Sequence, residues 1–252
     1  MFSNRYIYIY SSVMVIIVAA VLALAANLLK PYQDRNIRAE KIQNILASAG
    51  ITASRAEADS LYQKYIREEI VIDREGNVLS VYRDNRFETG NLRAFEVNLK
   101  IELKKLEAFL ADPSNPPPVF PLFIFSKDTL KEYIIPVQGK GLWGPIYGNI
   151  ALKSDMNTIA GANFGHDKET PGLGAEIALA PFQEQFVGKS IFDSGGNFSS
   201  IKVVKGGVAN SNIDPRHGVD AISGGTITSN GVSDMLLTNL ENYVSYFKNI
   251  QD

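Results

Sequence analysis

The chain has 252 residues, of which 45% are hydrophobic and 21% are charged, a composition typical of a globular protein with an added membrane segment. Its formal net charge of -2 gives no electrostatic reason to expect binding to nucleic acid. The chain has no cysteine and only two histidines, which excludes thiolate-bound iron–sulfur clusters, disulfides and thiol nucleophiles and argues against a histidine-rich metal site. Redox chemistry in this chain therefore requires an organic cofactor.

The N-terminal segment, residues 1–30, predicts a transmembrane anchor. No charged residue occurs from Ile7 to Leu29, and a helix of that length spans the roughly 30 Å hydrocarbon core of a bilayer. A cleaved signal peptide is the alternative, because residues 23–25 (Ala-Leu-Ala) resemble a small-residue cleavage site. The long apolar run and the scarcity of positive charge before it favour a retained anchor.

Residues 31–117 are predicted to form an N-terminal region of helices and one hairpin in the soluble part. Helical spacing of apolar residues predicts helices over residues 33–49 and 54–68. Residues 69–82 predict a hairpin, because two β-prone runs flank the turn sequence Arg-Glu-Gly-Asn. Residues 112–118 (Asp-Pro-Ser-Asn-Pro-Pro-Pro) have the composition of a linker and place the internal boundary there.

Residues 118–252 form the second predicted domain, in which short β-prone runs are separated by glycines. The runs typical of strands are residues 122–125, 132–135, 148–152, 158–162 and 200–204. Residues 229–250 predict a final amphipathic helix that packs on the domain. Strands and helices without regular alternation indicate an α+β fold rather than a doubly wound sheet.

Two glycine-rich clusters of this domain are candidates for ligand contact. Residues 139–148 hold Trp143, the only tryptophan of the chain, among glycines that would let a planar ligand approach closely. The structural alternative is a tight turn with Trp143 in the core. Residues 166–174 form a loop dense in hydrogen-bond donors, in which His166 is more typical of a structural residue than of a metal ligand.

A third cluster, residues 220–231, leads into the last predicted helix. Glycines before a helix N-terminus form a cradle for a phosphate, because free backbone N–H groups and the positive end of the helix dipole favour an anion. The hydroxyls of Ser223, Thr226, Thr228 and Ser229 add donors, and one of them could be esterified. Helix capping by one of these hydroxyls is the structural alternative.

The three clusters, together and in this order, resemble those of FMN-binding domains. The run from Asp220 to Thr226 resembles the flavinylation motif of that family, which reads Asp, two variable residues, Ser or Thr, Gly, Ala, Thr. Gly225 stands where the family usually has Ala, and as the smaller residue it does not block a phosphate. Residues 141–148 and 169–174 match the two other signatures. With its N-terminal span, the chain resembles the C subunits of sodium-translocating NADH:quinone reductases, and the G subunits of Rnf-type complexes are related to them.

This resemblance implies that FMN is joined by a phosphoester to the hydroxyl of Thr226, and that a separate flavin transferase moves it there from FAD. It implies no catalytic or metal-ligating residue in this chain. The other residues implied in the cofactor site are Leu142, Trp143, Tyr147, Glu169, Thr170, Gly172, Leu173, Gly174, Lys205, Asp220, Ser223, Gly224 and Gly225.

The resemblance also implies a place for the chain in the cell. It would be a single-pass electron-transfer subunit of a sodium-pumping NADH:quinone oxidoreductase, not catalytic alone, in the bacterial inner membrane. Its partners would be the other subunits, the flavin transferase and lipid, with no nucleic acid. The basic residues after the span favour a cytoplasmic domain by the positive-inside rule, whereas the resemblance favours the periplasm, because long domains can translocate despite such charges.

Two alternatives to this function remain at the level of sequence. The Rnf-type G subunit would share the anchor, the fold and the ester at Thr226, and would differ in its partners. A membrane-tethered binding module without a cofactor would use the glycine loops only as structure. A hydrolase is disfavoured, because no serine stands in a G-x-S-x-G elbow.

Overall fold

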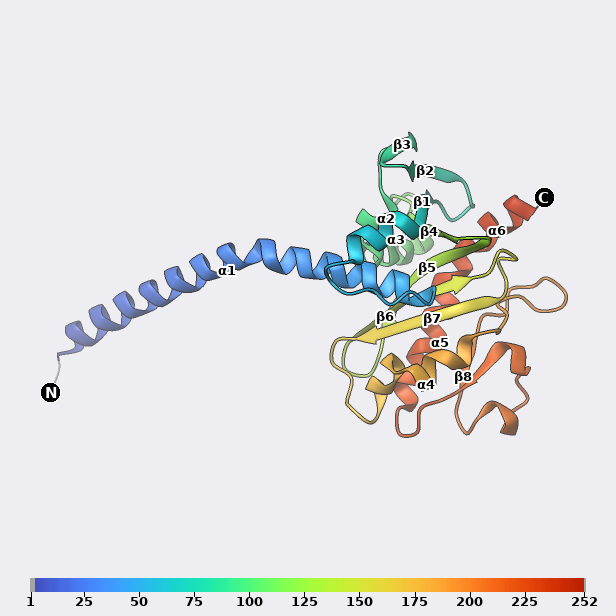
Figure 1. Cartoon of the computed structure of the whole chain (residues 1–252). Helices are drawn as coiled ribbons and strands as arrows, with labels where there is room; N and C mark the ends of the chain where they lie inside the picture. The colour runs from blue at the N-terminus through green and yellow to red at the C-terminus, as the bar shows by residue number, and fades with distance from the viewer. Residues whose placement is uncertain (1–2, 252) are drawn as a thin grey trace. The chain divides into compact units, whose positions relative to one another are not determined.

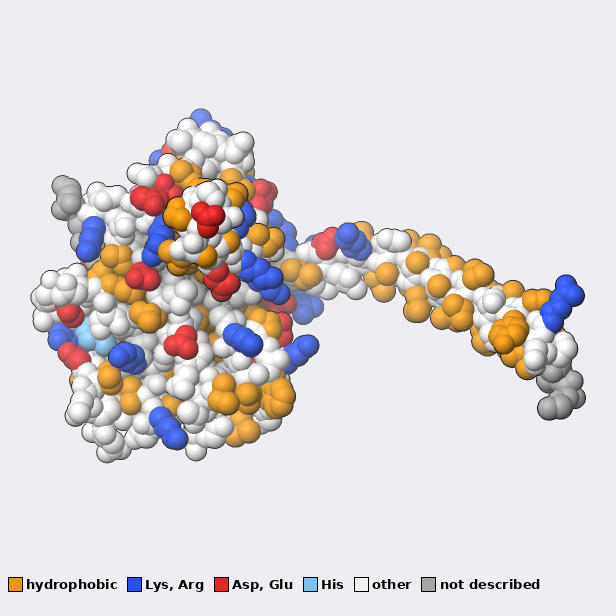
Figure 2. Space-filling model, turned by 180° about the vertical axis from the view of Figure 1, so that it is seen from behind, with side chains coloured by type: hydrophobic (Ala, Val, Ile, Leu, Met, Phe, Trp, Pro, Cys, Tyr) orange, Lys and Arg blue, Asp and Glu red, His pale blue; other side chains and the backbone are white. Residues whose placement is uncertain are grey.

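The computed structural model of the chain describes residues 3–251 and divides into two compact units, Met1–Ile42 and Gln43–Asp252. One helix, α1 (Asn4–Ser48), contributes to both units, and Pro31 lies inside it. Exposed apolar side chains cover its N-terminal half (Figure 2), which by length and composition is able to cross a membrane. The helix predicted over residues 33–49 is thus the continuation of the N-terminal helix rather than a separate element.

The second unit is built on one antiparallel sheet of seven strands in the order β3-β2-β1-β4-β5-β6-β7 (Figure 1). The strands are β1 (Ile66–Ile72), β2 (Val78–Arg83), β3 (Arg86–Thr89), β4 (Phe120–Lys127), β5 (Leu130–Lys140), β6 (Pro145–Leu152) and β7 (Ile159–His166). β1 and β2 confirm the predicted hairpin, but β1 starts at Ile66, where a helix was predicted to continue. Pairing of β1 with β4 overrides the local helical pattern there.

That β1–β4 pairing also joins the two regions that the proline-rich linker was expected to separate. Residues 112–118 connect a helix to β4, and the sheet continues on both sides of them. The predicted boundary near residue 117 therefore coincides with no break in the sheet.

Both faces of the sheet are covered, which confirms the α+β class (Figure 1). On one face lie α3 (Leu99–Ala111) and α5 (Thr226–Leu240), whose apolar side chains share one core with alternate residues of β4, β5 and β6. On the other face α2 (Ala58–Tyr65) packs the ring of Tyr62 edge-on against Phe123. α3 was not predicted from the sequence, although the Asn98 side chain caps it by accepting a hydrogen bond from the Ile101 N–H.

The segment after β7 wraps one edge of this sheet with short elements. They are η2 (Gly174–Ala178), α4 (Ala180–Gln183), η3 (Glu184–Phe186) and the parallel pair β8 (Lys202–Val204) and β9 (Gly218–Asp220). Phe164 of β7 packs against Phe182 and Phe186, which fixes the segment to the sheet. The predicted last helix is divided into α5, η6 (Glu241–Tyr243) and α6 (Val244–Gln251).

Candidate functional site

The first glycine-rich cluster forms the turn between β5 and β6. The N–H of Gly141 donates to the carbonyl of Gly144 at 2.8 Å, which closes the turn. Leu142 and Trp143 lie at its tip and are 46% and 64% exposed, so Trp143 is not the core residue that the structural alternative required. Two large apolar side chains on a glycine turn are available to a planar apolar ligand.

The second cluster is the loop that leads into η2. The carbonyl of Thr170 accepts hydrogen bonds from the N–H groups of Leu173 and Ala175, each at 3.1 Å. Gly172 has a φ of +76°, which favours glycine, and its N–H donates to Glu176 at 3.1 Å. The loop holds Leu173 at the surface, where the residue is 41% exposed.

The third cluster ends in the N-terminus of α5, whose first residue is Thr226. Its N-cap is Gly225, which provides no side-chain cap. The hydroxyls of Thr228 and Ser229 bond to Glu169 and to the N–H of Ile222 instead, so the helix start keeps free N–H groups. Within the described residues 3–251, no hydrogen bond occupies the hydroxyl of Thr226. An uncapped helix N-terminus with a hydroxyl at its first position suits a phosphate group.

Direct contacts bring the second and third clusters together. A Cβ built on Gly224 would lie 2.5 Å from Cδ2 of Leu173, and one built on Gly225 would lie 3.3 Å from the backbone N of Gly174. Any larger residue at Gly224 would therefore displace Leu173. The resemblance placed both positions in the cofactor site, and the structure adds that they accommodate the neighbouring loop.

One carboxylate, that of Glu169, connects all three clusters. It is buried, with 4% of the residue exposed, and accepts hydrogen bonds from the Trp143 N–H at 2.8 Å and from the Thr228 hydroxyl. Burial by itself raises the pKa of this carboxyl, but hydrogen bonds from Thr228 and from backbone N–H groups of residues 142–144 outweigh it and hold the pKa below its ordinary value. The carboxylate is therefore ionised at neutral pH.

Asp220 is the first residue of the third cluster, and Lys205 follows the strand that pairs with it. Val204 pairs with Asp220 across β8 and β9, and the Val204 carbonyl accepts a hydrogen bond from the N–H of Ala221 at 3.0 Å. Lys205 is the next residue after Val204 in the chain, and it is exposed. The Asp220 carboxylate accepts a hydrogen bond from the N–H of Val208 at 2.7 Å, and its own N–H donates to Gln185 at 2.7 Å. Asp220 thus fixes the loop after Lys205, while Ser223 is exposed at the turn before α5.

Tyr147, another of the proposed site residues, faces away from α5. It follows Ile146 in β6, and Ile146 belongs to the core under α5. Because side chains alternate along a strand, Tyr147 points to the opposite face of the sheet. There its ring covers Gly165, since a Cβ at that glycine would lie 2.7 Å from Cε2 of Tyr147.

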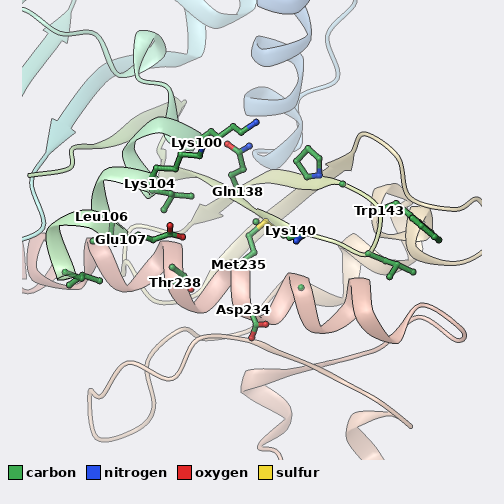
Figure 3. A pocket seen from close by; sticks show the side chains of 17 residues that line it. Lys100, Lys104, Leu106, Glu107, Gln138, Lys140, Trp143, Asp234, Met235 and Thr238 are labelled. Carbon is green, nitrogen blue, oxygen red and sulfur yellow. The ribbon is translucent and has the colours of Figure 1, made fainter. Parts of the chain in front are cut away.

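A groove of about 670 Å³ extends from Leu142 and Trp143 between α3 and α5. Figure 3 shows Asp234, Met235 and Thr238 of α5 along one side and residues of α3 along the other. Sequence reasoning missed this groove, and it also missed Ile227, which is 57% exposed. Helical spacing places Ile227 on the stripe of α5 that includes Gly231 and Asp234, a signal that was available from the sequence.

Comparisons with known proteins place this part of the chain in a family. Residues 141–241, which contain most of the converging residues, match the family described as the FMN-binding domain. The class defined by this fold and site is therefore that of proteins with an FMN-binding domain.

Relatives and solved structures narrow this class. The chain is 32% identical over 226 residues to the C subunit of the Na(+)-translocating NADH-quinone reductase of Vibrio anguillarum, covering 86% of this chain and 82% of the relative. The C subunit of the same reductase in Pseudomonas aeruginosa is 32% identical over 215 residues, covering 84% and 82%. A crystal structure of the C subunit from Parabacteroides distasonis has a TM-score of 0.71 and 36% identity, covering 87% of this chain and 96% of that one. NqrC of Shewanella oneidensis has a TM-score of 0.66 and 26% identity, covering 85% and 97%. The chain belongs to the family of C subunits of Na(+)-translocating NADH-quinone reductases.

Proposed function

We propose that this chain is the membrane-anchored electron carrier of a sodium-translocating NADH:quinone reductase, and that it holds FMN through a phosphoester to Thr226. The observation that carries the proposal is the uncapped N-terminus of α5, where Thr226 is the first residue. Free N–H groups and the helix dipole stabilise a phosphate at that place. The relatives named above are all C subunits of this reductase, which favours this complex over an Rnf-type one.

Attachment requires only a hydroxyl from this chain. A P–O bond to Oγ of Thr226 forms while a P–O bond of the FAD pyrophosphate breaks, AMP leaves, and the hydroxyl proton is released. The flavin transferase supplies the catalysis of this step. The chain contributes a helix start that is free of side-chain caps, with Gly225 buried against the neighbouring loop.

FMN would supply reversible electron transfer at its isoalloxazine ring. The exposed side chains of Leu142, Trp143 and Leu173 would contact that ring, and the N–H groups at the start of α5 would hold the phosphate. Lys205 would add a cation beside the third cluster. A covalent link prevents loss of the cofactor, and an exposed ring would allow close approach of neighbouring subunits.

The N-terminal half of α1 would anchor this carrier in the bacterial inner membrane, with the large unit on the periplasmic side. Its length and apolar composition support the anchor. The family relationship supports the other subunits of the complex as partners.

Intact-mass spectrometry of the full chain, co-expressed with a flavin transferase, tests the attachment. The expected result is a gain of one FMN less one water, lost in Thr226→Ala and retained in the matched control Ser194→Ala, which removes an exposed hydroxyl outside the three clusters. No gain in the wild-type chain, while the transferase modifies a control substrate, would contradict the ester. A membrane-tethered binding module without a cofactor would then be the better description.

A further inference from the structure

We infer that Glu169 is a positioning residue: its buried carboxylate fastens the turn carrying Leu142 and Trp143 to α5 through Thr228. The resemblance placed Glu169 among the cofactor contacts, but its side chain points into the protein. The inference rests on the proposed function and deepens it, because it names the residue that holds Leu142 and Trp143 at a fixed position relative to Thr226.

Both carboxylate oxygens of Glu169 are engaged by the protein. Oε1 accepts the hydrogen bond from the N–H of Trp143 at 2.8 Å, and Oε2 accepts the one from the Thr228 hydroxyl. The first partner lies between β5 and β6, and the second lies in the first turn of α5. One side chain therefore joins two elements that no backbone hydrogen bond of the described chain connects at this point.

The charge of this carboxylate is balanced by hydrogen-bond donors alone. Glu169 is 4% exposed, and none of the ion pairs found within residues 3–251 includes it. A buried carboxylate without a cation is unfavourable unless several donors point at it. The donors are rigid backbone N–H groups of residues 142–144 and one hydroxyl, so the charge orders the turn around itself.

Two glycines of the site are explained by the same carboxylate. A Cβ on Gly141 would lie 2.7 Å from Oε1 of Glu169, and a Cβ on Gly174 would lie 2.5 Å from Oε2 and overlap the Thr228 hydroxyl. Their small size admits the carboxylate. At Gly141, where the glycine pattern suggested close approach of a ligand, glycine is required by Glu169, and Gly174 meets the same requirement.

The consequence for function is pre-organisation of the site. Leu142 and Trp143 lie on the turn, Thr226 begins α5, and Thr228 is two residues further along that helix. A fixed link between Trp143 and Thr228 sets the separation of the ring contacts from the attachment point before any cofactor arrives. Without the link, only the packing of α5 against Lys140 and Ile146, at the two ends of the turn, would hold Leu142 and Trp143.

The single tryptophan makes this link measurable in the unmodified protein. Acrylamide quenching and fluorescence anisotropy of the full chain in detergent, expressed without a transferase, report on Trp143 alone. Glu169→Gln replaces one acceptor by an NH₂ group that faces donors. It is expected to increase the quenching constant by up to about 1.5-fold, since Trp143 is already 64% exposed, and to lower the anisotropy, as is Thr228→Val. Thr228→Ser keeps the hydroxyl and is expected to match the wild type.

Glu176→Gln is the matched control, because Glu176 follows in the same loop and its carboxylate accepts a hydrogen bond from Gly172. It is expected to leave the Trp143 signals unchanged.

Two results would overturn the inference. The first is wild-type Trp143 signals in a folded Glu169→Gln variant. If that variant does not fold, the second is equal Trp143 signals in Thr228→Val and Thr228→Ser. A mass gain in the wild type with unchanged Trp143 signals in the variants would contradict only the link. No mass gain with altered signals would contradict only the flavin ester.

Discussion

The side-chain amide of Asn239 on α5 pairs with the backbone of Gln138 on β5 in both directions. Oδ1 of Asn239 accepts from the Gln138 N–H at 3.2 Å, and Nδ2 donates to the Gln138 carbonyl at 2.9 Å. The pairing of β4 with β5 ends at Ile134, so Gln138 has no strand partner on that edge. Asn239 takes the place of a neighbouring strand and fixes α5 next to the turn that carries Trp143.

We expect Asn239→Ala to lower the free energy of unfolding by about 1–3 kcal/mol, because it leaves two backbone groups of Gln138 without a partner. Chemical denaturation of the full chain in detergent, followed by Trp143 fluorescence, measures this change. Asn230→Ala is the matched control, since Asn230 is exposed on the same helix. Its effect should stay within about 0.5 kcal/mol. Equal effects of the two substitutions would contradict a specific role for Asn239.

Gly231→Ala is expected to destabilise the protein, although alanine favours an isolated helix over glycine by about 1 kcal/mol. A Cβ at Gly231 would overlap the carbonyl oxygen of Lys140, which is a backbone atom and cannot rotate away. α5 would have to move off the end of β5. Thermal unfolding checks the sign, and Asn230→Ala serves again as the exposed neighbour. A higher melting temperature in Gly231→Ala would show that the helix and strand are further apart than described.

The sequence was sufficient to predict most strands of the sheet, because their β-branched and aromatic runs are local signals. It was misleading at Ile66, where a helical pattern runs into residues that pair with β4. Little in it indicated β3, whose four residues are all exposed and therefore carry no hydrophobic pattern.

The composition of the candidate site was predictable, but its internal contacts were not. The glycine clusters and Thr226 were recognised as motifs, whereas the Glu169–Thr228 hydrogen bond joins residues 59 positions apart. Such pairings depend on how β5, β6 and α5 pack. The orientation of Tyr147 depends on strand register, and one residue decides which face of the sheet its ring occupies.

Glu132→Gln is expected to stabilise the protein at neutral pH. One carboxylate oxygen of Glu132 is buried without a partner in the described structure, and burial raises the pKa of this carboxyl, with Lys153 opposing the rise. A pKa that is higher in the folded than in the unfolded chain contributes stability below the unfolded value, and this contribution is lost as the pH rises through the folded value.

Melting temperatures at pH 7 and pH 4 test this sign. The Glu132→Gln variant should melt above the wild type at pH 7, and the two should converge at pH 4, where the wild-type carboxyl becomes protonated. Glu107→Gln, at an exposed position of α3, should show no such dependence. A variant that melts below the wild type at pH 7 would indicate that the ionised carboxylate is favourably solvated.

Trp143 emission should fall strongly when FMN is attached to Thr226. The indole is 64% exposed at the tip of its turn, and the hydrogen bond of its backbone to Glu169 links that turn to α5 two residues beyond Thr226. A flavin ring held against the indole would quench its fluorescence, and since Trp143 is the only tryptophan, the loss is unambiguous. The comparison is between full chains co-expressed with the transferase, wild type against Thr226→Ala, with Ser194→Ala, at an exposed position outside the three clusters, as control. Full emission from a chain whose mass includes FMN would place the ring away from this turn.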